Sequence, residues 1–375
     1  MNQAVLDALA FLQRTNFRER AKSIAMIVSE RHPDVIGVTE ASSVGCFDSG
    51  NNACELNDDI AGAFVGDYVD VLLEELHHLG TPYSVVARSV NTDFSAVIST
   101  DGTFSETSLA RVQSLDQDIV LVKKDFDATA QVVDFGCPVD RRVGDGCKFS
   151  TLIPTGFSDP LPEEIIRSVS LVDLTVRGKD YRIALSHLER SPVVVDTPIV
   201  FQSSQAVELG KILINTTPPG KELILLIDSN SDPTDGADNH PAFTLPCPAQ
   251  ICGEEIDLPT PYFVLTMQFG FTDAWTFKKL GTHSKKGSKK KKGKGQKFGK
   301  HRDLGGKKTK KKKGKGGNIN MGFTWGQDAD LLNDESFPTF QRRIDQIFVL
   351  GGDNLKTTKN VEVLGEDQSD RTESG

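Results

Sequence analysis

Two polar side chains directly follow the most apolar run of the chain. Residues 223–233 read Leu-Ile-Leu-Leu-Ile-Asp-Ser-Asn-Ser-Asp-Pro, so Asp228 and Asn230 come at the end of the run. Such a run is typical of a strand buried on both faces. In extended backbone, residues two apart point to the same side, which places a carboxylate beside an amide at a strand end. Open α/β sheets carry their chemistry at strand ends, although these six polar residues are also ordinary turn formers.

Three further candidates lie in short apolar segments. Glu40 closes Asp-Val-Ile-Gly-Val-Thr-Glu at 34–40, and His187 closes Tyr-Arg-Ile-Ala-Leu-Ser-His at 181–187. Asp345 lies within Arg-Ile-Asp-Gln-Ile-Phe-Val at 343–349. Each has a plain structural alternative: a solvated strand end for Glu40, a hydrogen-bonded structural histidine for His187, and an ion pair with a neighbouring arginine for Asp345.

The elements around these residues are those of an α/β protein. Apolar residues at i, i+3, i+4 and i+7 predict a helix over 17–31, and further helices are expected over 60–79 and 203–213. Besides the segments above, strands are expected at 83–90, 96–99, 118–123, 130–134, 168–176 and 181–186. Because several strands follow one another without a helix between them, we expect mixed sheets rather than a simple alternating parallel sheet.

The order of five segments resembles the endonuclease/exonuclease/phosphatase superfamily, which has the deoxyribonuclease-I-like fold. The segments contain Glu40, His187, Asp228 with Asn230, Gly-Phe-Thr-Asp-Ala-Trp at 270–275, and Asp345. The resemblance extends from about residue 17 to the C-terminus. It implies one domain over 1–375, an α/β sandwich of two mixed β-sheets flanked by helices, and metal-assisted hydrolysis of a phosphate ester.

The resemblance also implies a role for each candidate. Glu40 would supply carboxylate oxygen to Mg²⁺, or to Mn²⁺ or Ca²⁺. Asp228 would orient and deprotonate the attacking water, and Asn230 would donate to a phosphate oxygen or hold Asp228 in position. His187 would donate to the phosphate, more strongly if it is protonated. Asp345 would orient a further histidine.

Two family features are missing from the expected places. Nothing before residue 17 resembles the Asn-bearing first strand, and no Ser-Asp-His motif is found near the end, where Ser369-Asp370-Arg371 stands. Three explanations stay open: an incomplete copy of an active phosphodiesterase, which we favour; a degenerate member that binds phosphate ligands without turnover; or a histidine supplied from elsewhere, such as His240 or His283. On this basis the chain is expected to be weakly active or inactive.

Charge is unevenly distributed along the 375 residues. The whole chain has 43 Lys+Arg and 52 Asp+Glu; residues 278–317 hold 19 of the former and only Asp303 of the latter, which leaves 24 basic against 51 acidic residues elsewhere. This Lys/Gly-rich insert is expected to be disordered, and clustered lysines favour nucleic acid as a partner. A solubilising segment, or attraction to the acidic body or to anionic lipid, would account for it equally well.

The six cysteines form three close sequence pairs: Cys46 with Cys54, Cys137 with Cys147, and Cys247 with Cys252. Their spacing is unlike a metal knuckle and favours local disulfides, hence a secreted protein in an oxidising compartment. Free thiols in a cytoplasmic protein are the alternative. No signal peptide and no membrane-spanning run are visible. A nuclease is the preferred activity; a sphingomyelinase-like or phosphoinositide-phosphatase-like lipid hydrolase, or a secreted non-catalytic phosphate- or nucleic-acid-binding protein, are the alternatives.

Overall fold

The computed structural model describes residues 17–48, 66–99, 109–124, 128–154, 164–189, 201–233, 244–245, 256–257, 259–276 and 343–351. Two β-sheets dominate these residues. The five-stranded sheet contains β1 (Val35–Val38), β2 (Ser43–Asp48), β3 (Gly66–Asp67), β4 (Tyr83–Ser99) and β5 (Leu109–Lys123). The eight-stranded sheet contains β6 (Ala128–Val132), β7 (Arg142–Val143), β8 (Gly146–Lys148), β11 (Ser168–Val176), β12 (Lys179–His187), β13 (Glu222–Asp228), β16 (Thr272–Asp273) and β17 (Asp345–Leu350).

Shorter elements complete the fold. The helices are α2 (Phe17–Arg31), α4 (Tyr68–His78), α5 (Phe201–Thr216) and α6 (Pro261–Phe263), with the 3-10 turn η1 (Val139–Arg141) and the π-helical turn η2 (Val264–Gln268). Two small ribbons pair β9 (Ile153–Pro154) with β10 (Glu164–Ile165) and β14 (Thr244–Leu245) with β15 (Ile256–Asp257). No helix among the described residues is long and apolar enough to cross a membrane.

The strand pairing confirms the expected α/β sandwich, but only one of its two sheets is mixed. In the first sheet every pairing is antiparallel, with β4 along one edge of β5 and both β1 and β2 along the other. The second sheet is mixed, because β12 and β13 run parallel while their outer neighbours β11 and β17 are antiparallel to them. A parallel pair needs a crossover, and α5 lies between β12 and β13 in the chain.

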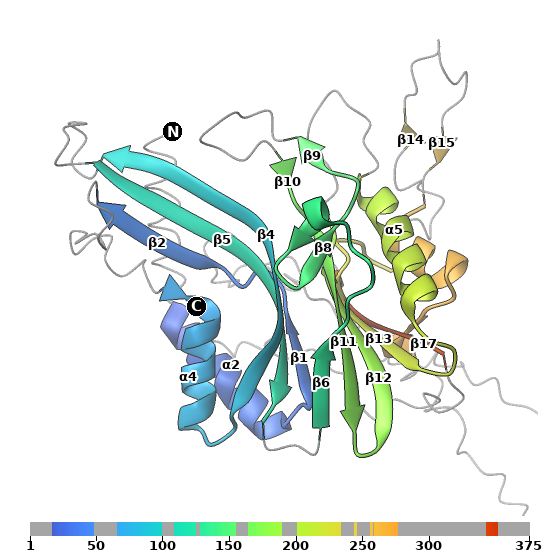
Figure 1. The fold of residues 1–375 in the computed structure, drawn as a ribbon, viewed down its shortest axis with the longest axis horizontal. Helices are drawn as coiled ribbons and strands as arrows, with labels where there is room; N and C mark the ends of the chain where they lie inside the picture. The colour runs from blue at the N-terminus through green and yellow to red at the C-terminus, as the bar shows by residue number, and fades with distance from the viewer. Residues whose placement is uncertain are drawn as a thin grey trace, which may run out of the picture.

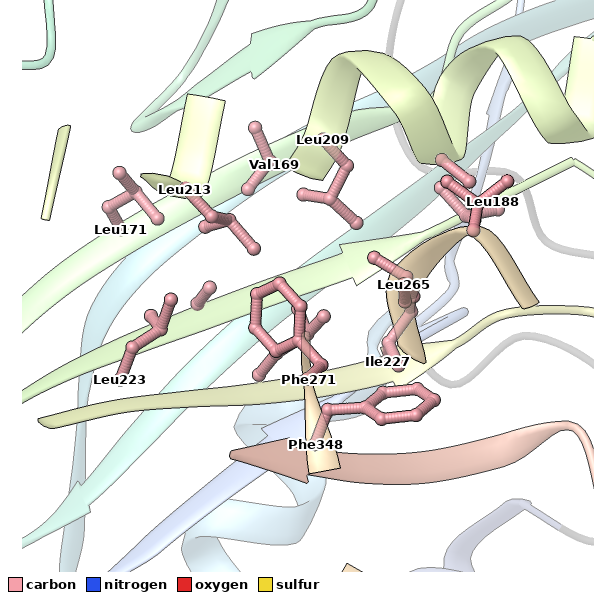
Figure 2. Packing of buried hydrophobic residues seen from close by; sticks show 14 of the residues in the cluster. Val169, Leu171, Leu188, Leu209, Leu213, Leu223, Ile227, Leu265, Phe271 and Phe348 are labelled. Carbon is pink, nitrogen blue, oxygen red and sulfur yellow. The ribbon is translucent and has the colours of Figure 1, made fainter. Parts of the chain in front are cut away.

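Three apolar layers hold the sandwich together. Between the sheets, Val120 and Val122 of β5 pack against Val172, Ile183 and Leu185 of the second sheet. The outer face of the first sheet is covered by α2 and α4, and that of the second by α5 (Figure 1). Figure 2 shows the last of these layers, where the leucines of α5 lie above Phe271 and Phe348.

The close approach of the two sheets requires a glycine at position 37. A Cβ built there would lie 2.8 Å from Leu185 Cδ1 and 2.9 Å from Leu226 Cδ1. Those distances are shorter than a normal carbon–carbon contact, so a side chain at position 37 would force Leu185 and Leu226 to shift. The contact sets the distance between Glu40, three residues further on, and the strand ends of the second sheet.

The β4–β5 hairpin is longer than the sequence pattern predicts. Two strands were expected at 83–90 and 96–99, but β4 runs without a break from Tyr83 to Ser99, with register shifts at Val85/Ala87 and Val90/Thr92. Similarly, β5 begins at Leu109 rather than at residue 118. The added part mixes polar and apolar residues of varied burial, and it extends as an arm past the sandwich (Figure 1). β2, which pairs with this arm, was not predicted.

The remaining expectations are largely confirmed. The helix predicted over 17–31 has those bounds as α2. The second helix, predicted over 60–79, begins only at Tyr68, because residues 66–67 form β3 and Asp67 caps the helix by accepting from Val69 N at 2.8 Å. The strands expected at 130–134, 168–176 and 181–186, and the helix at 203–213, are present with ends shifted by a few residues. Residues 278–317 lie outside the described part of the chain.

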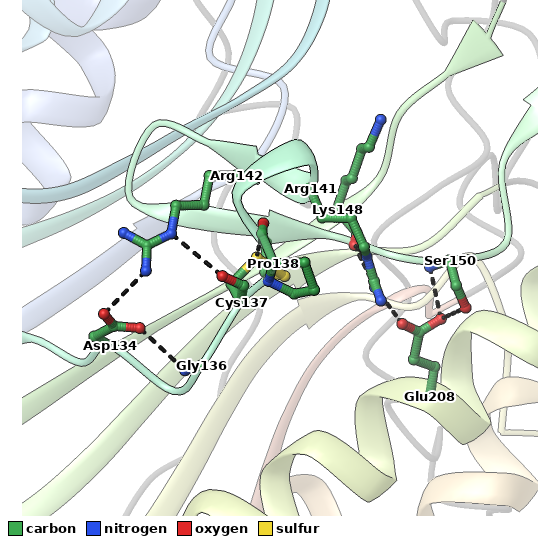
Figure 3. Close-up of a disulfide and its surroundings, with 10 residues drawn as sticks. Asp134, Gly136, Cys137, Pro138, Arg141, Arg142, Lys148, Ser150 and Glu208 are labelled. Atoms are coloured by element: carbon green, nitrogen blue, oxygen red, sulfur yellow. Dashed lines mark hydrogen bonds and ion pairs between the residues drawn. A yellow bond between two sulfur atoms is a disulfide. The ribbon is translucent and has the colours of Figure 1, made fainter.

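One disulfide is seen directly. Cys137 and Cys147 are bonded and enclose η1 and the turn between β7 and β8 (Figure 3). Arg141, inside this loop, donates to Glu208 of α5, whose other oxygen accepts from Ser150 Oγ at 2.6 Å. The pair Cys137–Cys147 is therefore confirmed. Cys46 is also disulfide-bonded, whereas Cys54, Cys247 and Cys252 lie outside the described residues.

Candidate active site

Three of the predicted catalytic residues occupy facing positions on three neighbouring strands. Asp228, at the end of β13, is the register partner of His187 at the end of β12. On its other side, Asp228 is the register partner of Asp345 at the start of β17. Residues directly opposite one another in adjacent strands point to the same face of the sheet. The three side chains therefore form one row along the edge of the second sheet.

Asn230 connects the ends of β12 and β13. Its side-chain Nδ2 donates to Leu188 O at 2.8 Å and lies 3.1 Å from His187 Nε2. Its backbone N–H donates to Asp228 Oδ1 at 2.8 Å. Asp228 Oδ2 lies 3.7 Å from His187 Nε2. The stretch after β13 is thus an Asx-type turn, as the composition allows, and it also joins the predicted site residues.

Glu40 approaches this row from the other sheet. It follows β1 in a left-handed backbone conformation with φ 54°, and Asn230 has φ 50°. The backbone after Glu40 is fixed to β5, because Ala41 N donates to Gln117 O at 2.8 Å and Gln117 Nε2 donates to Ala41 O at 3.3 Å. Asparagine tolerates this conformation, but glutamate is strained in it. Glu40 is thus in a strained backbone conformation.

Arg167 is a central residue that the sequence pattern did not single out. It precedes β11, and its side chain is only 11% exposed. Nη1 donates to Asp116 Oδ2 at 3.1 Å, and Nε donates to Glu189 Oε2 at 3.1 Å. The same Nη1 lies 3.0 Å from His187 Nδ1. One guanidinium thus joins a carboxylate of the first sheet, a carboxylate after β12 and the candidate histidine.

The burial of like charges shifts the carboxyl groups toward their neutral forms. Burial, the charge of Asp345 and that of Glu40 raise the pKa of Asp228 to about 7. The pKa of Glu40 is also raised, first by burial and then by Asp116, against a smaller opposing effect of Arg167. Burial also raises the pKa of Asp116, although the charge of Arg167 opposes this shift. A carboxylate with a pKa near neutrality suits a general base.

His187 is shifted in the opposite direction. Burial, and secondarily the charge of Arg167, lower the pKa of His187 to about 3. The ring is therefore neutral at physiological pH. The condition under which protonation would strengthen its donation to a phosphate is therefore not met near neutral pH, because burial and the Arg167 guanidinium both disfavour the imidazolium.

The carboxylates of Glu40 and Asp116 are chemically suited to bind a hard divalent cation. Glu40 and Asp116 repel one another, and Asp116 Oδ1 is buried without a hydrogen-bond partner. Such oxygens are the ligands that Mg²⁺, Mn²⁺ and Ca²⁺ prefer. Across the described residues, no three His, Cys, Asp or Glu side chains are close enough to form a complete metal site. A cation here would therefore rely on water and substrate oxygens for part of its coordination.

A second buried polar group lies behind the row, between the sheets. Asn91 Nδ2 donates to Asp118 Oδ2 at 2.7 Å, and Ser168 Oγ donates to Asn91 Oδ1 at 2.7 Å. Burial raises the pKa of Asp118 to about 7, and Asp118 Oδ1 has no hydrogen-bond partner. The polar layer thus continues from the site into the sandwich.

Two arginines were expected as alternative ion-pair partners of Asp345: Arg342 lies outside the described residues, and Arg343 has another carboxylate partner. The Arg343 guanidinium binds Asp273 instead, with Nη1 donating to Oδ1 at 3.2 Å, and it lies over the Trp275 ring. Arg343 N donates to Asp232 Oδ2 at 2.6 Å. The motifs at 270–275 and 343–349 therefore support one another structurally. The orienting role of Asp345 stays a prediction, because His240, His283 and residues 369–371 lie outside the described residues.

Comparison with known proteins gives structural neighbours alone. No protein-family model and no curated protein matches the chain. Among solved structures, an endonuclease/exonuclease/phosphatase family protein from Leptotrichia buccalis is 14% identical, with a TM-score of 0.43, over 89% of this chain and 82% of that one. D. rerio TDP2 complexed with single strand DNA product is 13% identical, with a TM-score of 0.36, over 90% and 79%. The human Nocturnin catalytic domain with bound sulfate anion is 12% identical, with a TM-score of 0.33, over 69% and 66%.

Similarities this weak carry no argument about this chain. The sheet topology itself shows an α/β sandwich of two β-sheets. Activity and substrate have to be inferred from the site itself.

Proposed function

We propose that this chain is a metal-dependent phosphoesterase that hydrolyses a phosphodiester, with nucleic acid as its preferred substrate class. The observation that carries the proposal is the row His187, Asp228 and Asp345, formed by register partners on three adjacent strands. Glu40 lies close enough to this row for its charge to raise the pKa of Asp228. A base, hydrogen-bond donors and clustered carboxylates at one sheet edge are the groups that phosphodiester hydrolysis requires.

Each residue has a defined task in this proposal. Asp228, with its pKa near 7, takes the proton from the attacking water. Asn230 and His187 offer N–H groups to a phosphate oxygen, where negative charge develops. Glu40, assisted by Asp116, would hold the divalent cation, which offsets charge on the phosphate and the leaving oxygen. Asp345 raises the pKa of Asp228 and so keeps the base near neutrality.

Hydrolysis of bis-p-nitrophenyl phosphate tests the proposal. With Mg²⁺, Mn²⁺ or Ca²⁺ we expect slow turnover that EDTA abolishes and that rises with pH up to about 7, as Asp228 loses its proton. Asp228→Asn should lower the rate by about 100-fold or more, the usual contribution of a general base. Asp134→Asn, at an exposed carboxylate bound to Arg142, is the matched control and should retain the rate. Turnover that survives Asp228→Asn would contradict the assignment.

The preference for nucleic acid rests on the charge of residues 278–317. Lysine clusters bind phosphate backbones by releasing counterions, which makes affinity depend steeply on salt. We expect deletion of 278–317 to weaken binding to a DNA oligonucleotide and to flatten its salt dependence, while hydrolysis of the small substrate stays unchanged. Unchanged DNA affinity after the deletion would remove the insert from the proposed interface.

A further inference from the structure

Both ring nitrogens of His187 face hydrogen-bond donors. Arg167 Nη1 lies 3.0 Å from Nδ1, and Asn230 Nδ2 lies 3.1 Å from Nε2. A guanidinium can only donate. The amide of Asn230 is oriented by Leu188 O, which accepts from Nδ2 at 2.8 Å. Turning the amide over would bring its oxygen against that carbonyl oxygen, so the NH₂ group stays toward the ring.

This arrangement cannot be satisfied by the histidine alone. A neutral imidazole has one nitrogen that accepts and one that donates, and an imidazolium has none that accepts. One of the two neighbouring donors must therefore meet a ring N–H. With the proton on Nε2, the contact of Arg167 with Nδ1 is a hydrogen bond and the contact of Asn230 with Nε2 is not. With the proton on Nδ1, the reverse holds.

We infer that Arg167 is a positioning residue that fixes His187 as the neutral tautomer protonated on Nε2. A hydrogen bond from a charged donor is about twice as strong as one from a neutral amide. Arg167 is also held in place by Asp116 and Glu189, both at 3.1 Å, so its Nη1 cannot turn away from the ring. Asn230 keeps its hydrogen bond to Leu188 O in either tautomer. Leaving its second N–H without an acceptor on the ring therefore costs less than leaving the Arg167 guanidinium without one.

The tautomer has a direct consequence at the site. The Nε2–H of His187 and the second N–H of Asn230 then lie beside one another, and Asp228 Oδ2 is 3.7 Å from Nε2. One external oxygen could accept from both groups. The inference deepens the proposed function, because it makes His187 a neutral donor to a phosphate oxygen. The pKa of His187, lowered to about 3, agrees with a ring that stays neutral.

Nitrogen-15 NMR of the histidine rings tests the inference without substrate or metal. Long-range proton–nitrogen spectra distinguish a protonated ring nitrogen from an unprotonated one, and the His187 signals are identified by their loss in His187→Gln. We expect Nδ1 to be unprotonated and Nε2 protonated in the wild-type protein at pH 7. The reverse pattern, or an imidazolium, would overturn the inference. Failure of the hydrolysis assay would leave this readout intact, so the two proposals fail separately.

Variants decide which neighbour sets the tautomer. In Arg167→Met the donor on Nδ1 is lost, so Nε2 should accept from Asn230 and the proton should move to Nδ1. Arg167→Lys should keep the wild-type pattern, as should Asn230→Ala. Arg142→Met, at a half-exposed arginine, is the control for losing a guanidinium elsewhere. A wild-type pattern in folded Arg167→Met would contradict the role of Arg167. If that variant does not fold, the wild-type and Asn230→Ala spectra still decide.

Discussion

At the scale of single residues, the site combines strain and buried charge. Glu40 has positive φ, and so does Arg177 in the exposed turn between β11 and β12. Only Glu40 lies among buried carboxylates, which raise its pKa. The two positions therefore share a backbone cost but differ in chemical surroundings, which makes them a matched pair for experiment.

Glycine substitution should separate strain from function. A non-glycine residue at positive φ costs about 1 kcal/mol or more, so both Glu40→Gly and Arg177→Gly should raise the free energy of unfolding. Urea denaturation measures the gain. We expect Glu40→Gly to abolish calcium or magnesium binding, measured by calorimetry, whereas Arg177→Gly leaves binding unchanged. A destabilised Glu40→Gly would show that Glu40 stabilises the fold.

The buried Asp118 predicts a pH-dependent stability. Its pKa is raised to about 7, so the folded protein binds the proton more tightly than the unfolded chain, whose aspartates titrate near pH 4. The corresponding stability is fully present below about pH 4 and is lost as the pH rises to about 7, at roughly 1.4 kcal/mol per pKa unit. Asp118→Asn should therefore stabilise the protein at pH 8 more than at pH 5 in urea denaturation. Asp134→Asn is the control, because the pKa of Asp134 is lowered by Gly136 N–H and Arg142.

At the scale of elements, hairpins explain both what the sequence predicted and what it missed. The Asp228–Asn230 pair and His187 were predictable because each follows a clear apolar run, and Asp345 because it precedes one. Arg167 was missed, although a signal existed. In a tight hairpin the start of the first strand lies beside the end of the second, so an arginine just before β11 must lie near His187 at the end of β12. Asp116 gave no such signal, since it belongs to the polar part of β5 that lacked a strand pattern.

The contact of β1 with the second sheet predicts that a methyl group added at position 37 destabilises the protein. Gly37→Ala would bring a Cβ within 2.9 Å of Leu185 and Leu226 and push the sheets apart near Glu40. Overpacking of this kind typically costs about 1–3 kcal/mol. We expect lower stability, measured by urea denaturation, and slower hydrolysis, because Glu40 moves away from Asp228. Gly45→Ala is the control: its close neighbour is the Phe47 ring on the same strand, which can turn aside.

At the scale of the whole molecule, the loop closed by Cys137–Cys147 is attached to α5 through Arg141 and Glu208 (Figure 3). The disulfide supports our proposal that the protein works in an oxidising compartment, because such bonds are rare where thiols are kept reduced. The loop also touches the first sheet, where Arg88 N donates to Asp145 Oδ2 at 3.0 Å. Its conformation thus affects both halves of the sandwich.

Removal of this disulfide should be measurable in the whole protein. Replacing Cys137 and Cys147 together by serine should lower the free energy of unfolding by about 2–3 kcal/mol, the usual effect for a short loop. Thermal denaturation checks the loss. Addition of a reductant should lower the melting temperature of the wild-type protein as well, unless the bond contributes nothing to stability.

The pairing of β17 with β13 also determines at which point of protein synthesis the row of site residues can form. Arg343 N and Asp232 Oδ2 are joined across 111 positions of sequence, and Asp345 enters the row only through that pairing. Closing a long chain segment costs little more than closing a moderate one, so a large insertion before β17 is thermodynamically tolerable. During synthesis, however, Glu40, His187 and Asp228 emerge from the ribosome well before Asp345. A nascent chain therefore carries most of the proposed hydrolytic groups before β17, the strand that completes their row, has been synthesised.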